Sequence, residues 1–350
     1  MRVYTGSDAS GNRPIEEAPL KEKILVTGGA GFIGSHLCEL LVHSGNEVTA
    51  IDDLSTGRLE NIEHLRPLPN FKFVREDITN SQVLDRLTSQ AELVIHLAAA
   101  VGVKLIVDDP VHTIATNIMG TEAVLTTANR YGCKVLIAST SEVYGKGVKV
   151  PFCEDDDRLM GSTKHSRWAY ATSKAVDEFL GLAYQRQYGL PVVIMRFFNT
   201  VGPRQTGRYG MVVPRFVRQA LRNEPITVYG DGQQSRCFAD VSDVVQAVSR
   251  LSVHPQAVGQ VFNIGTTEEV TISELAERVV ALTKSKSEIV LVPYEAAYAP
   301  GFEDMRRRVP SIEKIHQLIG YQPRYSLEDT MRRVIEFERN QLALDSRFTA

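Results

Sequence analysis

The 350-residue sequence has few cysteines, little net charge and no long apolar segment. Its four cysteines show no C-x-x-C spacing, so we expect neither a disulfide framework nor a metal site. The net charge of −3 lacks the basic excess that is typical of nucleic-acid and membrane-surface binding. The longest apolar run, LVIHLAAAVGVKLIV, is too short for a bilayer and contains His96 and Lys104. These features favour a cytoplasmic protein that binds neither nucleic acid nor membrane.

The N-terminal stretch also lacks the apolar h-region of a signal peptide. It is polar and contains Gly, Pro and Ser, so we expect residues 1–22 to form a flexible extension. Beyond it, short apolar strand-like segments alternate with helix-like segments. The expected strands are 23–28, 47–53, 71–78, 91–99, 133–140 and 191–198, and the expected helices are 32–45, 81–89, 113–132 and 169–189. This alternation predicts βαβ units and a doubly wound parallel sheet of the α/β class.

The character of the sequence changes after Asn199. The segment NTVGPRQTGRYGMVVPRF is rich in Gly, Pro and Arg, and mixed helix and strand fragments follow it. We therefore expect a smaller α/β substrate domain, interleaved with the larger one. The expected limits are 23–199 and about 236–265 for the larger domain, 200–235 and 266–341 for the smaller one, and 342–350 for a tail.

The stretch TGGAGFIG follows the first expected strand and opens a helix. Its glycines Gly28, Gly31 and Gly34 have the G-x-x-G-x-x-G spacing. Glycine at these positions permits a tight turn, a close approach of backbone N–H groups to a pyrophosphate, and close packing of helix on strand. The helix N-terminus favours the phosphate charge. In this strand–turn–helix context the motif predicts a Rossmann-type dinucleotide site.

The second expected strand ends in Asp52 and Asp53. A carboxylate at this point can bind the hydroxyls of the adenosine ribose, and it repels the 2′-phosphate of NADP. We therefore expect NAD as the cofactor, with Asp52 as the ribose ligand. The alternatives are that Asp52 is an ordinary turn residue, or that Arg58 nearby weakens the preference for NAD.

Tyr170 and Lys174 are four residues apart in an expected helix and therefore share a face. A tyrosine hydroxyl has a pKa of about 10, but a nearby ammonium favours the phenolate and lowers that pKa. The pair can then take a proton from a sugar hydroxyl while the carbon gives hydride to nicotinamide. Thr140, at the end of the fifth strand, would supply a hydroxyl to the same oxygen. The alternative is that this spacing marks an ordinary surface helix.

The sequence resembles the extended short-chain dehydrogenase/reductases through TGGAGFIG, HLAA, STSEVYG and the Tyr170–Lys174 pair. The likeness extends over roughly 23–341 and implies NAD in the larger domain and a nucleotide sugar in the smaller one. The cofactor contacts that we expect are Gly28, Gly31, Phe32, Ile33, Gly34, Asp52, Asp77, Ile78, Leu97, Ala98, Ala99, Tyr170 and Lys174.

Two later segments, RFFNTVGPR and VYGDGQQSRCFADVSDV, are also similar to that family. They imply that Asn199 contacts the substrate phosphate and that Arg236 lies near the uridine diphosphate, although a surface arginine is the alternative for Arg236. The resemblance further implies a homodimer, formed through helices around 114–130 and 170–187 that would pack into a four-helix bundle.

Within the family, Ser141-Glu142 is most similar to the UDP-glucuronate decarboxylases. Sugar 4-epimerases usually have a small residue in place of Glu142, and 4,6-dehydratases have an Asp-Glu pair. The segment GFEDMRRRVPSIEKI is also similar to the decarboxylases, in which an arginine stands two residues before a proline. That arginine is Arg308 here, before Pro310. The alternatives are that Glu142 caps a helix or pairs with a lysine, and that the arginine run is a solvated face.

The chemistry of UDP-glucuronate accounts for this set of residues. Oxidation at C4 makes a β-keto acid, which loses carbon dioxide readily because the electrons flow into the ketone as an enolate. By resemblance, Glu142 would act as acid or base or would order a water, and Arg308 would bind the anionic groups of the substrate. Thr140, Ser141, Tyr170 and Lys174 would surround the C4 oxygen. The expected product is UDP-xylose, a UDP-4-keto-pentose, or both.

One segment departs from the family pattern. After HLAA the decarboxylases usually carry a Pro-rich stretch with a tyrosine, whereas this chain has AVGVKLIVDDP, in which Lys104 would contact the sugar or remain solvated. The departure leaves open a 4-epimerase of UDP-glucuronate or another UDP-sugar. A 4,6-dehydratase is disfavoured by Ser141. A non-catalytic NAD-sensing protein on the same fold is disfavoured because Tyr170 and Lys174 are both present.

Overall fold

The computed structural model describes residues 21–101, 109–207, 211–297 and 303–348. The expected N-terminal extension falls mostly outside them. A seven-stranded parallel sheet forms the centre of the larger part of the chain, with strand order β11-β6-β5-β4-β1-β2-β3. Its strands are β1 (Lys23–Thr27), β2 (Glu47–Asp52), β3 (Phe71–Arg75), β4 (Leu93–His96), β5 (Lys134–Thr140), β6 (Val192–Phe197) and β11 (Gln260–Ile264).

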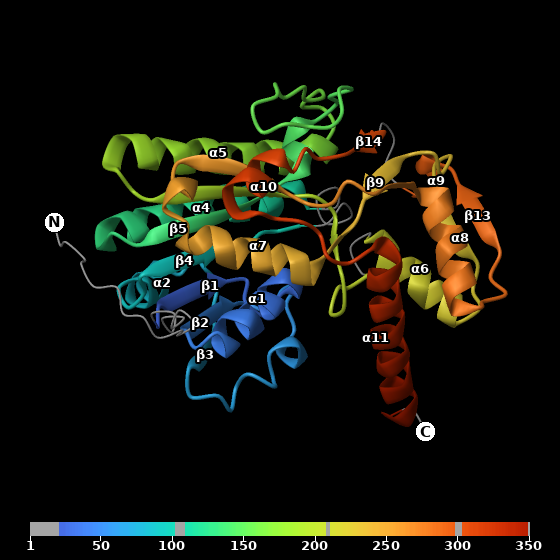
Figure 1. Cartoon of the computed structure of the whole chain (residues 1–350), viewed down its shortest axis with the longest axis horizontal. Coiled ribbons are helices and arrows are strands. Elements are labelled where there is room, and N and C mark those ends of the chain that lie inside the picture. Colours follow the sequence, from blue (N-terminus) through green and yellow to red (C-terminus); the bar gives the residue numbers. More distant parts are fainter. Residues whose placement is uncertain (1–20, 102–108, 208–210, 298–302, 349–350) are drawn as a thin grey trace, which may run out of the picture.

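Helices cover both faces of this sheet (Figure 1). On one face, α1 (Phe32–His43), α7 (Val241–Val253) and α10 (Glu313–Ile319) contribute to one apolar core. On the other, α2 (Ser81–Thr88), α4 (Pro110–Tyr131) and α5 (Arg167–Tyr188) contribute to a second. Strands buried on both faces read as continuous apolar runs, as β4 and β6 do. The arrangement confirms the predicted doubly wound α/β fold.

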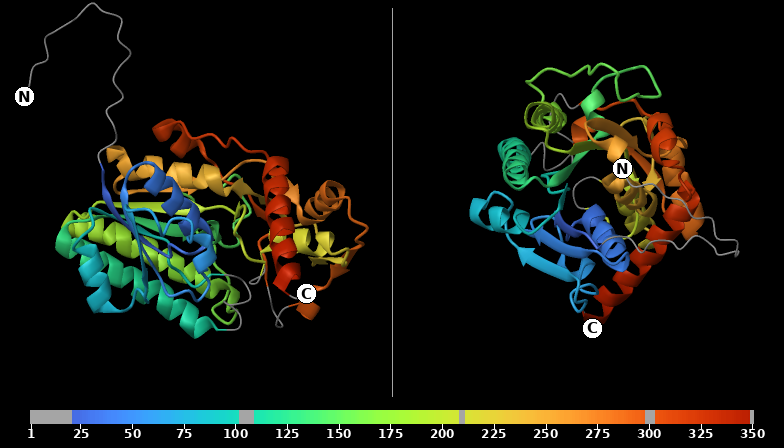
Figure 2. Two further views of the ribbon diagram at one scale, coloured as in Figure 1. Left: turned by 90° about the horizontal axis from the view of Figure 1, so that it is seen from below. Right: turned by 60° about the vertical axis from the view of Figure 1, so that its left-hand side comes forward.

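Local sequence signals define the ends of the helices next to the site. The side chain of Asp109 caps α4 by accepting a hydrogen bond from the backbone N–H of His112, and Pro110 occupies the first helical position. The helix ends at Gly132, and α5 ends at Gly189, both in the left-handed conformation that favours glycine. The helices α4 and α5 pack side by side along the sheet (Figure 2).

A smaller set of elements adjoins the larger sheet, with α6 (Val212–Leu221), α8 (Ile272–Thr283) and α11 (Leu327–Phe348) around its own apolar core. Two short sheets complete it, one with order β13-β8 and one with order β12-β9-β14. Figure 1 shows these elements together at one end of the molecule. The remaining elements are η1 (Leu59–Asn61), η2 (Ser141–Tyr144), β7 (Thr200–Val201), β8 (Ile226–Tyr229), β9 (Ser235–Cys237), β10 (Ala239–Asp240), η3 (Pro255–Ala257), β12 (Glu269–Thr271), β13 (Ile289–Val292), α9 (Tyr294–Ala297) and β14 (Arg307–Arg308).

The chain crosses between the two parts several times. After β9 it returns to the larger sheet through α7 and β11, in the region where we expected a returning segment. The helix α10 also packs on α7 and β11, although the expected limits assigned it to the smaller domain. The helix α11 continues to Phe348, so much of the expected tail at 342–350 is helical. No helix in the described ranges has the length and apolarity that a membrane span requires.

Candidate active site

A pocket of about 420 Å³ lies where the parallel strands of the large sheet end and the smaller part begins. Open α/β sheets bind ligands at the carboxyl ends of their strands, so this is the expected location for a site. Most of the side chains that we predicted from the sequence line it. They are Gly28, Gly31, Phe32, Ile33, Gly34, Asp52, Leu97, Ala98, Ala99, Thr140, Ser141, Glu142, Tyr170, Lys174, Asn199, Arg236 and Arg308.

The glycine-rich turn forms one wall of the pocket. Gly28 has φ +70°, and a Cβ there would lie 2.8 Å from the backbone nitrogen of Ala98. A Cβ at Gly34 would collide with the carbonyl oxygen of Gly28, so the third glycine allows α1 to pack against the turn. No side chain caps the N-terminus of α1 at Gly31. This leaves a helix N-terminus facing the pocket, which fits the pyrophosphate of a dinucleotide.

Asp52 ends β2 beside this turn. Its carboxylate accepts hydrogen bonds from the backbone N–H of Ala30 at 3.0 Å and of Leu54 at 2.8 Å. Burial raises the pKa of Asp52, while these two hydrogen bonds oppose the increase. The carboxylate thus lines the pocket at the end where an adenosine ribose would lie, which fits NAD. Its role as the ribose ligand stays a prediction.

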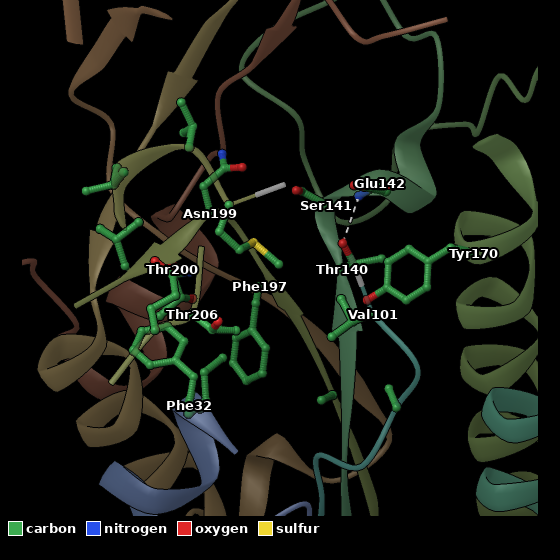
Figure 3. A pocket seen from close by; sticks show the side chains of 18 of the residues that line it. Phe32, Val101, Thr140, Ser141, Glu142, Tyr170, Phe197, Asn199, Thr200 and Thr206 are labelled. Carbon is green, nitrogen blue, oxygen red and sulfur yellow. Dashed lines mark hydrogen bonds between the residues drawn. The ribbon is translucent and has the colours of Figure 1, made fainter. Parts of the chain in front are cut away.

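The side chain of Tyr170 projects from α5 toward the end of β5, where it lies beside Thr140 (Figure 3). Burial raises the pKa of Tyr170, and the negative charges of Glu142 and Asp177 raise it further. A hydrogen bond with Thr140 and the positive charge of Arg308 act in the opposite direction. The hydroxyl therefore lies in a buried site, where the surrounding charges decide how readily it can release a proton.

Lys174 lies one turn further along α5 and is almost completely buried. Its ammonium donates a hydrogen bond to the carboxylate of Asp177 at 2.7 Å. The sequence reasoning did not identify Asp177. The signal available in the sequence was its position three residues after Lys174, but this spacing alone does not show that both groups are buried.

Arg308, on β14 of the smaller part of the chain, reaches residues that follow strands of the larger sheet. Its guanidinium donates to the side-chain oxygen of Asn199 at 3.0 Å, pairs with the carboxylate of Glu142 at 3.3 Å and lies 3.5 Å from the hydroxyl of Ser141. Alternate residues of a strand point to opposite sides, so in β14 the neighbouring Arg307 points outward and pairs with Glu269. The arginine run is therefore divided between the surface and the site.

The far end of the pocket contains Arg236, whose guanidinium forms an ion pair with Asp304 at 2.8 Å. Arg236 is in register with Arg308 on the neighbouring strand. Sequence reasoning did not identify Asp304, or the Arg215 guanidinium that lies 4.0 Å over the ring of Tyr229. Further lining residues that it did not identify are Thr56, Val101, Phe197, Thr206, Gln234, Phe238, Ile272 and Tyr294.

Two expected site residues, Asp77 and Ile78, do not line the described pocket. Ile78 is buried in the core, and Asp77 is exposed and accepts hydrogen bonds from the backbone and hydroxyl of Thr79. Their contacts with the cofactor stay predictions. Lys104 lies outside the described residues. No group of three His, Cys, Asp or Glu side chains in the described part of the chain is arranged to hold a metal ion.

Comparison with known proteins places the chain in a family. The family model described as GDP-mannose 4,6 dehydratase matches residues 25–334. A UDP-N-acetyl-alpha-D-glucosaminuronate decarboxylase from Bacillus cytotoxicus is 43% identical over 321 residues, covering 91% of this chain and 98% of the relative. UDP-glucuronic acid decarboxylase 1 from Arabidopsis thaliana is 37% identical over 339 residues, covering 96% of this chain and 74% of the relative.

A solved structure of a nucleotide-sugar enzyme is also similar to this chain. UDP-glucuronic acid 4-epimerase from Bacillus cereus, determined with UDP-glucuronic acid and NAD, aligns with a TM-score of 0.82 and 31% identity, covering 91% of this chain and 99% of the other. These findings, with a pocket whose glycine turn and Asp52 fit NAD, confirm the predicted family and cofactor. The chain belongs to the NAD-dependent epimerase/dehydratase family of extended short-chain dehydrogenase/reductases.

Proposed function

We propose that this protein is an NAD-dependent decarboxylase of a UDP-linked uronic acid, with UDP-glucuronate as the substrate. The observation that carries the proposal is the contact of Arg308 with Ser141, Glu142 and Asn199. It places an anion-binding guanidinium and a carboxylate beside the hydroxyls of Thr140 and Tyr170. A carboxylated sugar needs both a cation to hold its charge and a group to manage the proton at C5.

The first chemical step is oxidation at C4. Bound NAD supplies a hydride acceptor for C4 and later a donor. In our assignment the oxygen of Tyr170 takes the proton of the C4 hydroxyl, and Thr140 holds that oxygen through its own hydroxyl. The burial of Tyr170 and Lys174 keeps water away from the new ketone.

The second step breaks the bond between C5 and the carboxylate carbon. Carbon dioxide leaves, and the bonding electrons pass into the C4 ketone to form an enolate. We assign Glu142 to relay to C5 a proton that it takes up from solvent, directly or through an ordered water, and Arg308 to fix the substrate carboxylate before it leaves. Tyr170 then returns its proton to the C4 oxygen as hydride returns to C4, which gives UDP-xylose. Release before this reduction gives the UDP-4-keto-pentose.

The substrate occupies both parts of the chain in this proposal. NAD lies in the larger domain, and Asn199 and Arg236 bind the diphosphate and uridine side of the sugar nucleotide. The pairing of Arg236 with Asp304 supports this placement, because it holds the guanidinium at the pocket wall instead of in bulk water.

A second candidate substrate is the 2-acetamido form of the same uronate. It is favoured by the Bacillus cytotoxicus relative, which is 43% identical and carries that activity in its name. The two substrates differ only at C2, so the decarboxylation chemistry assigned to Glu142 and Arg308 is the same for both. Carbon dioxide release from each compound with NAD, expressed as kcat/KM, tests the choice. We expect UDP-glucuronate to be preferred, and preference for the 2-acetamido compound would change the substrate but not the reaction.

We also propose that the protein is a homodimer through α4 and α5. These packed helices expose Val111 and Met119 on α4 and Phe179 and Tyr188 on α5, with Val111 77% and Met119 61% exposed. A second copy that packs on them would bury this apolar surface. We place the protein in the cytoplasm, which is consistent with free thiols at its four cysteines.

A double Met119→Asp and Phe179→Asp variant should convert the dimer into a monomer, because each charge would be buried without a partner. Sedimentation equilibrium should then give about half the mass of the wild type. The matched control is Val148→Asp, which changes a loop side chain that is 92% exposed and should leave the dimer intact. A wild-type protein that sediments as a single 38.8 kDa chain would contradict the proposed dimer.

A further inference from the structure

The catalytic lysine has a buried acidic neighbour that the mechanism above does not use. Asp177 follows Lys174 by three residues on α5, whereas Tyr170 precedes it by four, so the two groups flank the lysine along the helix. The carboxylate of Asp177 is fully buried and accepts a hydrogen bond from the Lys174 ammonium at 2.7 Å. A buried carboxylate is costly unless it is paired, so this contact holds the ammonium on the Asp177 side.

Buried polar side chains of α4, β4 and β1 lie behind Asp177 and are joined to one another by hydrogen bonds. Burial raises the pKa of Asp177 and the nearby hydroxyl of Thr121 acts in the opposite direction; Thr121 also contacts the Nε2 atom of His96 at 3.1 Å. The Nδ1 atom of His96 contacts the hydroxyl of Thr27 at 2.8 Å, and the oxygen of Thr27 accepts from the backbone N–H of Ala98. These contacts extend from Thr121 on α4 through His96 on β4 to Thr27 on β1, beside Ala98 in the wall of the cofactor pocket.

The direction of each hydrogen bond follows from the charge at its end. An ionised carboxylate only accepts, so a Thr121 hydroxyl directed toward Asp177 would accept from the Nε2–H of His96. The Nδ1 atom of His96 then accepts from Thr27, whose oxygen receives the Ala98 N–H. This requires a neutral imidazole, and burial, followed by the charge of Lys174, lowers the pKa of His96 to about 3. One oxygen of the Asp177 carboxylate accepts from Lys174, and the other, Oδ1, is buried with no hydrogen-bond partner among the described residues.

We propose that Asp177 is a positioning residue for the catalytic pair, whose charge holds the Lys174 ammonium and sets the pH at which Tyr170 can take the substrate proton. The inference rests on the proposed function. A negative charge near Tyr170 opposes formation of the phenolate, and an ammonium drawn toward Asp177 stabilises the phenolate less. Among the described residues, the other charged and titratable groups around Tyr170 and Asp177 are Glu142 from η2, Arg308 from β14, His96 from β4, and Lys174 and Glu178 from α5.

Removal of the Asp177 charge should lower the pH at which Tyr170 ionises. Burial, Glu142 and Asp177 raise the pKa of Tyr170. Removal of the Asp177 charge removes one of these contributions and frees the ammonium, and both changes favour the phenolate. An Asp177→Asn variant should therefore reach half-maximal kcat at a pH about one unit lower than the wild type, the scale of a single charge in a partly buried site. The KM for the uronate should change little, because Asp177 does not line the pocket.

The experiment compares Asp177→Asn, Asp177→Ala and Asp177→Glu with the wild type in pH profiles of kcat with NAD and UDP-glucuronate. Asp177→Ala is a second neutral variant with a good helix former, and Asp177→Glu keeps the charge and should keep the wild-type midpoint. The near-ultraviolet absorbance of ionised tyrosine gives a substrate-free reading in the NAD-bound enzyme. Each protein is titrated against its own Tyr170→Phe partner, so the difference reports Tyr170 alone.

Failure of the Asp177 inference can be told apart from failure of the proposed decarboxylase function. The inference is supported if the pH of half-maximal kcat, or the pH at which Tyr170 ionises, is lower in Asp177→Asn and Asp177→Ala. Asp177→Glu should then behave like the wild type. Loss of kcat at every pH with an unchanged midpoint would make Asp177 a purely structural residue, and so would failure of all three variants to fold. If UDP-glucuronate is not turned over at all, the proposed function fails, and the absorbance titration still decides the role of Asp177.

Discussion

Replacement of Tyr170 by phenylalanine should lower kcat by about 10²–10⁴-fold, the usual loss when a positioned acid–base group is removed. The side chain keeps its shape and its buried position on α5, so the fold and NAD binding should be retained. Release of carbon dioxide from UDP-glucuronate measures the loss. Tyr325→Phe is the control, because Tyr325 lies outside the pocket and the proposed dimer face and is 37% exposed.

The Tyr170→Phe variant also tests whether the protein is an enzyme or a non-catalytic NAD-binding protein of the same fold. If Tyr170→Phe retained full turnover, another group would take the C4 proton and our assignment of Tyr170 would be wrong. If neither the wild type nor the variant turned over any UDP-sugar while both bound NAD, the binding-protein reading would be favoured instead.

Replacement of Glu142 by glutamine should lower kcat for carbon dioxide release by about 10²–10⁴-fold, because the acid–base group assigned to C5 is lost. The KM for the uronate should stay the same or fall, because the amide leaves the charge of Arg308 free to hold the substrate carboxylate. Steady-state kinetics of carbon dioxide release gives both constants. Glu60→Gln, an exposed change in η1, is the control.

A loss confined to KM would contradict this role for Glu142. It would mean that the carboxylate serves only to hold Arg308 in place. In that case Arg308→Lys, which keeps the charge but cannot contact Ser141 and Asn199 in the same way, should reproduce the Glu142→Gln result.

The central sheet could be predicted because its signals are local. Apolar β-branched runs such as that of β6 alternate with amphipathic helices, and Gly28 and Gly34 stand where a side chain would meet backbone. The position of Arg308 beside Glu142 could be predicted only through the family resemblance. The two residues are 166 apart in the chain, and nothing in the local pattern of three arginines shows which one turns inward.

What could not be predicted depends on contacts between distant or buried groups. Asp304 pairs with Arg236 across 68 residues, and no spacing rule links them. Asp177 is close to Lys174 in sequence, but its effect depends on complete burial and on Thr121 and His96 from other elements. Helical periodicity gives the face of a residue and not its electrostatic surroundings, so the pairing of Lys174 with Asp177 became visible only in the structure.

The fate of the uronate carboxylate distinguishes decarboxylation from epimerisation most directly. We would incubate the purified protein with UDP-glucuronate and NAD, follow the mixture by proton NMR, and run Glu142→Gln beside it. We predict a UDP-pentose or its 4-keto form, with carbon dioxide released and the variant strongly impaired. Formation of UDP-galacturonate with the carboxylate retained would contradict the account, because the enzyme would then be a 4-epimerase.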